Sequence, residues 1–229
     1  MADSFLLSPA FLISAAITLG AGGYSYIYLP FQMRKAYRQS LMALARAVEI
    51  KDSGAEGHGE RVAKLVVAVA REMRLPRKDR QKLEYAAFLQ DVGNVRVPHA
   101  MLNKTTRLTQ KEFNIVKMHT VIGAEIIEQI KFLQDIAPTV RYHHEMWDGS
   151  GYPDGLSGED IPLTARILTV CTSYDSMIHA RAYRQQMDEE SAIREIRAEA
   201  GTKHDPVVVD AFLKALKKHH RMEGKQIDS

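Results

Sequence analysis

Two adjacent histidines in front of a glycine-rich loop are the strongest chemical feature of this sequence. His143 and His144 end a helical pattern, and the segment 148–156 (DGSGYPDGL) follows almost at once. Glycine allows positive φ and proline fixes its own φ, so this segment is predicted to turn sharply and rigidly. Neutral imidazole is a good ligand for Fe, Mn or Zn. The pair and its loop therefore predict a metal site, although two surface histidines would give the same local pattern.

Three further residues of metal-binding type are dispersed upstream of this pair. His58, Asp91 and His119 each lie in or at the edge of a helical pattern. Any one of them alone is more often structural than functional. Together with the histidine pair they predict a distributed site, in which carboxylate and imidazole ligands hold a divalent ion inside a helical bundle.

The order of these motifs resembles the HD-GYP branch of the HD phosphohydrolase superfamily, over roughly Lys51 to Leu216. The matching strings are KD at 51–52, GHGERV at 57–62, DVG at 91–93, MH at 118–119, HHE with WDGSGYP and DGL at 143–156, and RAYR at 181–184. Active members are all-helical phosphodiesterases that linearise or fully hydrolyse cyclic di-GMP with two or three metal ions. The resemblance implies an all-α, HD-type helical bundle and a cyclic dinucleotide ligand.

The sequence departs from the family pattern where the metal chemistry is concentrated. Gln90 replaces the histidine of the His-Asp pair, Asn94 replaces a lysine, and Thr172 replaces an aspartate. In the family one metal is held by the residues that match His58, Gln90, Asp91 and Thr172, so half of its protein ligands are replaced here. An amide or a hydroxyl is neutral and weakly basic, and Asn94 cannot offer phosphate an ammonium charge.

The second metal position keeps its full set of ligands. The resemblance assigns it Asp91, His119 and His143, with His144 available for the extra ion seen in some members. The expected cofactor is therefore a divalent metal (Fe, Mn or Zn), bound as one ion or none rather than as two.

Two arginines and a tyrosine are the candidates for contact with the nucleotide. Arg181 and Arg184 match family positions that contact the phosphates of the cyclic dinucleotide, and a planar guanidinium donates two parallel hydrogen bonds to such a group. Without the motif they would be two solvated charges at helical spacing. Tyr152 either frames the ligand or packs against the body of the domain.

The N-terminal segment is predicted to cross a membrane once. No charged residue occurs between Asp3 and Arg34, and residues 5–29 exceed the roughly 20 apolar residues that a transmembrane helix needs. Arg34, Lys35 and Arg38 follow the segment, which predicts an inner-membrane protein with its domain on the cytoplasmic side. A cleaved signal peptide is the alternative, but its basic N-terminal region is absent.

These patterns divide the chain into four parts. We expect a transmembrane anchor at 1–33, a juxtamembrane linker helix at 34–50, the HD-GYP-like domain at 51–221 and a C-terminal tail at 222–229. The apolar stripe of the linker either forms a homodimer seam or packs on its own domain. The lone Cys171 has no partner for an intrachain disulfide, as in a reducing compartment.

Helical periodicity predicts the elements that position the candidate site. The expected helices are 61–74, 78–89, 164–177, 189–200 and 207–217, and no strand pattern of useful length is present. Thr109 and Glu112 form a capping-box pattern that should open the helix carrying His119. Gly123, one turn later, should let another helix or a ligand approach closely.

Two function classes follow, and a third is kept as an alternative. The first is a membrane-anchored, degenerate HD-GYP domain in cyclic di-GMP signalling, which binds a ligand or a signalling protein partner with weak or absent hydrolysis. The second is an active, metal-dependent cyclic di-GMP phosphodiesterase, and the third is a purely structural anchor. The net charge of +3, from 31 basic and 28 acidic residues, gives no reason to expect a nucleic acid polymer as partner.

Overall fold

A computed structural model describes residues 8–51, 56–179 and 186–222 of the chain. These residues fold into helices, and no β-sheet forms among them. The prediction of an all-α protein is confirmed. The chain divides into two compact units, residues 1–41 and 42–229.

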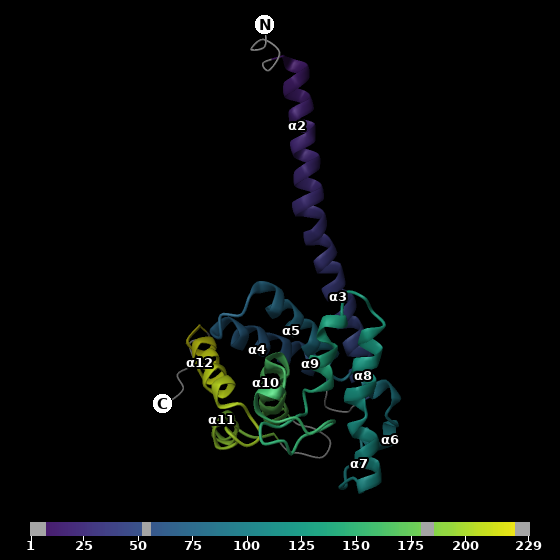
Figure 1. Cartoon of the computed structure of the whole chain (residues 1–229), viewed down its shortest axis with the longest axis vertical. Helices are drawn as coiled ribbons and strands as arrows, with labels where there is room; N and C mark the ends of the chain where they lie inside the picture. The colour runs from purple at the N-terminus through teal and green to yellow at the C-terminus, as the bar shows by residue number, and fades with distance from the viewer. Residues whose placement is uncertain (1–7, 52–55, 180–185, 223–229) are drawn as a thin grey trace. The chain divides into compact units, whose positions relative to one another are not determined.

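The first unit consists of a long exposed helical stretch (Figure 1). It begins with α2 (Pro9–Gly23), passes through the π-helical turn η1 (Tyr24–Tyr28) and continues into α3 (Leu29–Glu49), whose residues from Met42 on belong to the second unit. Ser8 caps the start, because its hydroxyl accepts a hydrogen bond from the Phe11 N–H at 3.3 Å. Among the described residues this is the helix that is long and apolar enough to cross a membrane.

The second unit is a helical bundle in which α4 (His58–Glu72) packs against α5 (Arg77–Leu89), α10 (Leu163–Ile178) and α12 (Pro206–Met222). Val62, Val66 and Val69 repeat at three- and four-residue intervals along α4 and are buried, as expected for a helix at the centre of a bundle. The remaining elements are η2 (Val92–Arg96), α6 (His99–Leu102), α7 (Gln110–Lys117), α8 (His119–Glu128), η3 (Gln134–Ile136), α9 (Ala137–Arg141), η4 (Gly158–Asp160) and α11 (Glu189–Ala198).

The capping box forms as predicted, but it opens a different helix. The Thr109 hydroxyl accepts from the Glu112 N–H at 3.4 Å, and the Glu112 carboxylate accepts from the Thr109 N–H at 2.7 Å. The helix that they open is α7, which ends at Lys117 because the Met118 N–H turns back to the Ile115 carbonyl. The expectation that this helix carries His119 is wrong, since His119 is the first residue of α8.

Helix boundaries differ from the predicted ones by a few residues. Helix α4 begins at His58 rather than at residue 61, because Gly57 adopts a φ of 70° that leads the chain directly into the helix. Helix α12 continues to Met222, beyond the predicted residue 217. The compact second unit begins at Met42, within the segment expected to be a linker. The four predicted domain limits remain predictions.

Candidate metal centre

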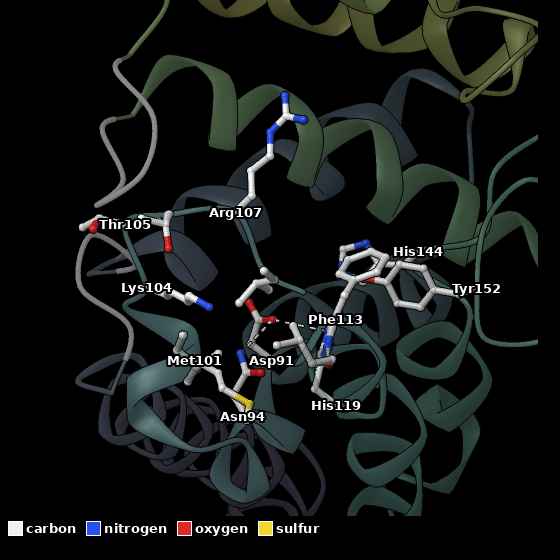
Figure 2. A pocket seen from close by; sticks show the side chains of 14 residues that line it. Asp91, Asn94, Met101, Lys104, Thr105, Arg107, Phe113, His119, His144 and Tyr152 are labelled. Carbon is white, nitrogen blue, oxygen red and sulfur yellow. Dashed lines mark hydrogen bonds and ion pairs between the residues drawn. The ribbon is translucent and has the colours of Figure 1, made fainter. Parts of the chain in front are cut away.

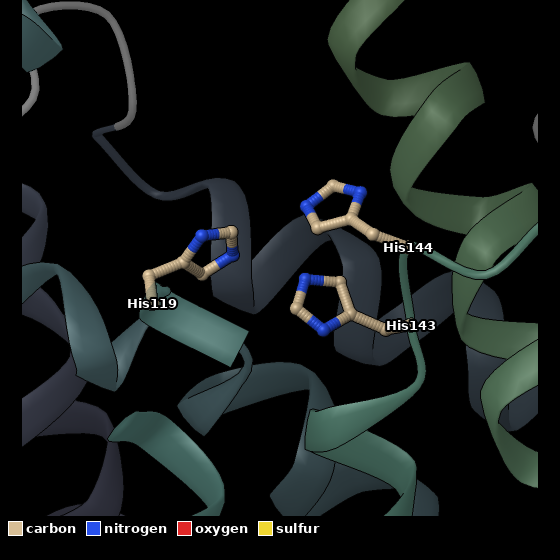
Figure 3. Close-up of side chains that lie close together, drawn as sticks. All are labelled: His119, His143 and His144. Carbon is tan, nitrogen blue, oxygen red and sulfur yellow. The ribbon is translucent and has the colours of Figure 1, made fainter. Parts of the chain in front are cut away.

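Three histidines from two segments lie around one small space. His119 starts α8, and His143 and His144 follow α9 (Figure 3). One ring nitrogen from each lies within 4.8 Å of the others. Oδ1 of Asp91, at the end of α5, is 3.7 Å from Nε2 of His119. The structure therefore brings together four of the five residues predicted to bind metal.

The rings of His119 and His143 are held so that the same nitrogen faces this space. Nδ1 of His119 lies 2.8 Å from the Val116 carbonyl, and Nδ1 of His143 lies 2.6 Å from the Val140 carbonyl. A carbonyl accepts only, so Nδ1 carries the proton and Nε2 keeps its lone pair. Both Nε2 atoms are buried and have no hydrogen-bond partner among the described residues. Buried, unpaired lone pairs aimed at one space fit a bound cation.

Burial also keeps His143 in the form that binds metal. Desolvation, followed by the neighbouring charge of His119, lowers the pKa of His143 to about 4. The imidazole is therefore neutral near neutral pH, and its lone pair is available to a metal.

The neighbouring position, where the resemblance places the other metal, is arranged differently. The Thr172 hydroxyl donates to Oε1 of Gln90 at 2.7 Å, so the two replaced residues bond to each other. The hydrogen bond takes one of the two lone pairs of this oxygen, and the amide nitrogen, buried and without a partner among the described residues, is a donor that cannot ligate a cation. A neutral amide and a neutral hydroxyl stand where the family pattern has an imidazole and a carboxylate. The residues at this position therefore do not fit a second metal of the family type.

His58, the fifth predicted ligand, is held by a buried aspartate of α10. Nδ1 of His58 lies 2.7 Å from Oδ2 of Asp175. The Asp175 carboxylate also accepts two hydrogen bonds from Arg61, at 2.8 Å through Oδ1 and at 3.0 Å through Oδ2. Burial favours a raised pKa for Asp175, but the hydrogen bonds from His58 and Arg61 prevail and lower it. Sequence reasoning missed this role of Asp175. Its signal in the sequence was that Asp175 is the one acidic residue of α10.

Hydrogen bonds and close packing hold the turns of the glycine-rich loop. Oε1 of the buried Glu145 accepts from the N–H groups of Asp154 and Gly155 at 2.7 and 3.0 Å. A Cβ atom on Gly151 would lie 2.3 Å from the backbone nitrogen of Met146, so only glycine fits there. Tyr152 stacks on His144 with ring centroids 4.8 Å apart. The loop therefore braces one metal-binding histidine directly.

A cleft of about 450 Å³ opens onto the centre (Figure 2). This volume is within the range of small-molecule sites. Its polar lining includes Asp91, Asn94, His119 and His144, and its apolar lining includes Met101, Leu102, Leu108, Phe113 and Val116. Lys104 and Arg107 also line it, and Lys104 is paired with Glu112 at 2.7 Å. Tyr152 lines the cleft, whereas Arg181 and Arg184 lie outside the described residues.

Two glycines set the distance between the Asp91 segment and α8. A Cβ atom on Gly93 would lie 1.9 Å from the His119 carbonyl oxygen, so backbone meets backbone there. Gly123 faces the backbone nitrogen of Gly93 and the side chain of Val140, and a Cβ atom on it would lie 3.4 and 3.2 Å from them. The close approach expected at Gly123 is confirmed.

A helical bundle that gathers an aspartate and histidines from separate segments around one buried space defines a metal-binding domain of HD type. The family model described as HD domain matches residues 42–208, and the chain belongs to this family.

The relatives agree with the predicted HD-GYP branch. The chain is 38% identical over 185 residues to the cyclic di-GMP phosphodiesterase response regulator RpfG of Xanthomonas campestris pv. campestris, covering 80% of this chain and 49% of that one. It is 39% identical over 168 residues to a cyclic di-GMP phosphodiesterase of Thermotoga maritima, covering 72% and 46%. The chain thus spans about half the length of these relatives.

A solved structure agrees with the fold. The cyclic GMP-AMP specific phosphodiesterase of V. cholerae superposes with a TM-score of 0.63 at 18% identity, over 82% of this chain and 50% of that one. The HD-type helical fold predicted from the sequence is confirmed.

Proposed function

We propose that this chain is a membrane-anchored, degenerate HD-GYP domain of cyclic di-GMP signalling, which binds its ligand or a protein partner with weak or absent phosphodiesterase activity. Relatives named as cyclic di-GMP phosphodiesterases support the ligand class. The observation that carries the proposal is the hydrogen bond between Gln90 and Thr172, two neutral side chains that bond to each other where the family pattern has metal ligands.

The proposed loss of activity follows from the donors that remain. Two-metal hydrolysis needs one ion to generate hydroxide while the pair holds the attacking and leaving oxygens. Asp91, His119 and His143, with His144 beside them, have the donor set for one divalent ion. Such an ion would supply positive charge for a phosphate oxygen. The chain itself keeps His143 neutral, fixes the tautomers of His119 and His143 and directs their Nε2 atoms at the space where the ion would lie.

The nucleotide is proposed to lie in the cleft beside this ion. Tyr152 would frame the ligand, and Arg181 and Arg184 would contact its phosphates. Nδ2 of Asn94 lies 3.4 Å from Oδ1 of Asp91, so this side chain turns toward the carboxylate and offers the ligand no cation. The site would thus bind phosphate with less positive charge than the family pattern implies.

The proposed membrane anchor consists of α2, η1 and the first part of α3. Their apolar length supports a single-pass anchor, and the basic residues Arg34, Lys35 and Arg38 support a cytoplasmic side for the domain. Ala45 and Val48 of the linker stripe are buried within the chain, which supports packing on its own domain. Tyr37 and Leu44 are exposed and would form the seam of a homodimer.

Elemental analysis of the chain purified without chelator, combined with calorimetric binding and turnover of cyclic di-GMP, tests the proposal. We expect about one divalent ion per chain, measurable nucleotide binding and little turnover. The variant His99→Ala, at an exposed histidine outside the centre, is the matched control and should behave like the wild type. Two ions per chain with robust turnover would instead establish the active phosphodiesterase.

A further inference from the structure

The C-terminal end of α3 carries a carboxylate that is bonded to the start of α4. Oε2 of Glu49 accepts from the Gly57 N–H at 2.9 Å, and Oε1 accepts from the Gly59 N–H at 2.8 Å. These two N–H groups flank His58. The first N–H groups of a helix have no partner within it, and a carboxylate there also favours the helix dipole. Glu49 therefore fixes where α4, and with it His58, begins.

The fit around this carboxylate is close. A Cβ atom on Gly59 would lie 3.2 Å from Oε1 of Glu49 and 3.3 Å from the Ala87 carbonyl oxygen. The start of α4 thus lies between the end of α3 and the end of α5. The Glu49 side chain cannot shift far without displacing the backbone beside His58.

Two residues further on, a lysine is bonded to the segment that follows Asp91. Nζ of Lys51 donates to the carbonyl oxygens of Asn94, Val95 and Val97 at 3.1, 2.9 and 3.1 Å. An ammonium group has three donors, so these bonds use all of them. They hold the end of η2, which starts immediately after Asp91.

We infer that Glu49 and Lys51 are positioning residues of the metal centre. Glu49 holds the start of α4, which packs on the end of α5 just before Asp91, and Lys51 holds the segment just after Asp91. The inference rests on the proposed function, because it concerns the same centre. A displacement of the end of α3 moves both segments together, since the two side chains stand only two residues apart. By reciprocity, a metal ion that fixes Asp91 also fixes the end of α3.

Binding of Mn²⁺ alone to the full chain in detergent tests this coupling, with free Mn²⁺ counted by electron paramagnetic resonance. We expect Glu49→Gln and Lys51→Met each to weaken Mn²⁺ binding about tenfold, as loss of outer-shell partners does. Lys51→Arg, which keeps a cationic donor, should restore most of the affinity. The matched controls are Glu72→Gln, at the opposite end of α4 beside Lys218, and Lys82→Met, beside Asp135. Both controls should stay within about twofold of the wild type.

Thermal unfolding of the metal-free variants separates positioning from general stability. A lower unfolding temperature with unchanged Mn²⁺ affinity would show a merely structural role and overturn the inference. If Glu49→Gln does not fold, Glu49→Asp, with a shorter carboxylate, takes its place and should also weaken binding. If the wild type binds Mn²⁺ and the variants bind it equally well, this inference is wrong, but the proposed function is unaffected. A wild type that binds none defeats the proposed function and the inference with it.

Discussion

Thr172 of α10 donates a hydrogen bond at 2.7 Å to Gln90, the residue directly after the last residue of α5. The pair joins the two positions where the family pattern has metal-binding side chains. Neither residue contributes a charge, and the hydrogen bond takes one of the two lone pairs of the Gln90 amide oxygen.

Restoring both ligands should therefore restore the second ion. We expect Gln90→His combined with Thr172→Asp to raise bound metal from about one to about two ions per chain, since an imidazole and a carboxylate replace two neutral groups. Elemental analysis checks the ratio. Each single variant should stay near one ion, because the position then still lacks a donor. An unchanged ratio in the double variant would refute the ligand assignment.

Adding Asn94→Lys to that double variant should raise the hydrolysis of cyclic di-GMP. An ammonium beside the metals would stabilise charge on phosphate, and one such contact is worth about 100-fold in turnover. Linear product measured by chromatography gives the rate. Asn94→Gln in the same background is the control of similar length without charge. Equal rates for the two would mean that residue 94 does not face the phosphate.

Loss of a histidine ligand should remove the stabilisation that metal gives. At a Mn²⁺ concentration of about 100 times its dissociation constant, binding stabilises the folded chain by about 2.7 kcal/mol. We expect His119→Ala to lose most of this, whereas His99→Ala should keep it. Unfolding temperatures with and without Mn²⁺, and after chelation, measure the difference. A full Mn²⁺ response in His119→Ala would exclude this ring as a ligand.

The capping box beside the cleft predicts a pH dependence. The hydrogen bond from Lys104, followed by those from Thr109, lowers the pKa of Glu112 from 4.5 to about 2. A depressed carboxylate pKa gives stability that is present above the unfolded value and is lost as pH falls through the folded value. The advantage of wild type over Glu112→Gln should therefore be constant above pH 4.5 and shrink toward pH 2. Unfolding curves at several pH values would show a constant gap if the pairing were absent.

The anchor predicts how the chain partitions in cells. A lysine at the centre of a membrane helix costs about 3 kcal/mol in insertion, so Ile17→Lys should release part of the chain from the membrane fraction. Val207→Lys, at an exposed apolar residue of α12, is the control and should leave partitioning unchanged. Sedimentation of membranes after lysis measures both. Ile17→Lys protein that pellets like the wild type would argue against a membrane-spanning helix.

The helical fold and much of the centre followed from local patterns. Apolar residues repeat along α4 and α10, turn formers punctuate the loop after His144, and imidazoles stand at family spacing. His119, His143 and His144 converge because each belongs to a motif that can be read in sequence. The boundary at Met118 could not be read, because a single backbone hydrogen bond separates α7 from α8.

Contacts between side chains on different helices could not be predicted from the sequence. Glu49 accepts hydrogen bonds from Gly57 and Gly59, and Asp175 accepts from His58 and Arg61. These bonds depend on how the helices pack against one another. Periodicity tells which face of a helix is buried but not which residue lies opposite. The same holds for Thr172 and Gln90. The sequence shows that they stand in place of family metal ligands, but it does not show that they bond to each other.

The contact of Gly93 with the His119 carbonyl has a consequence for substitutions far from any ligand side chain. Main-chain atoms meet directly there, so any side chain at residue 93 would push η2 away from the start of α8. Asp91 and His119 would then separate, although neither residue had been changed.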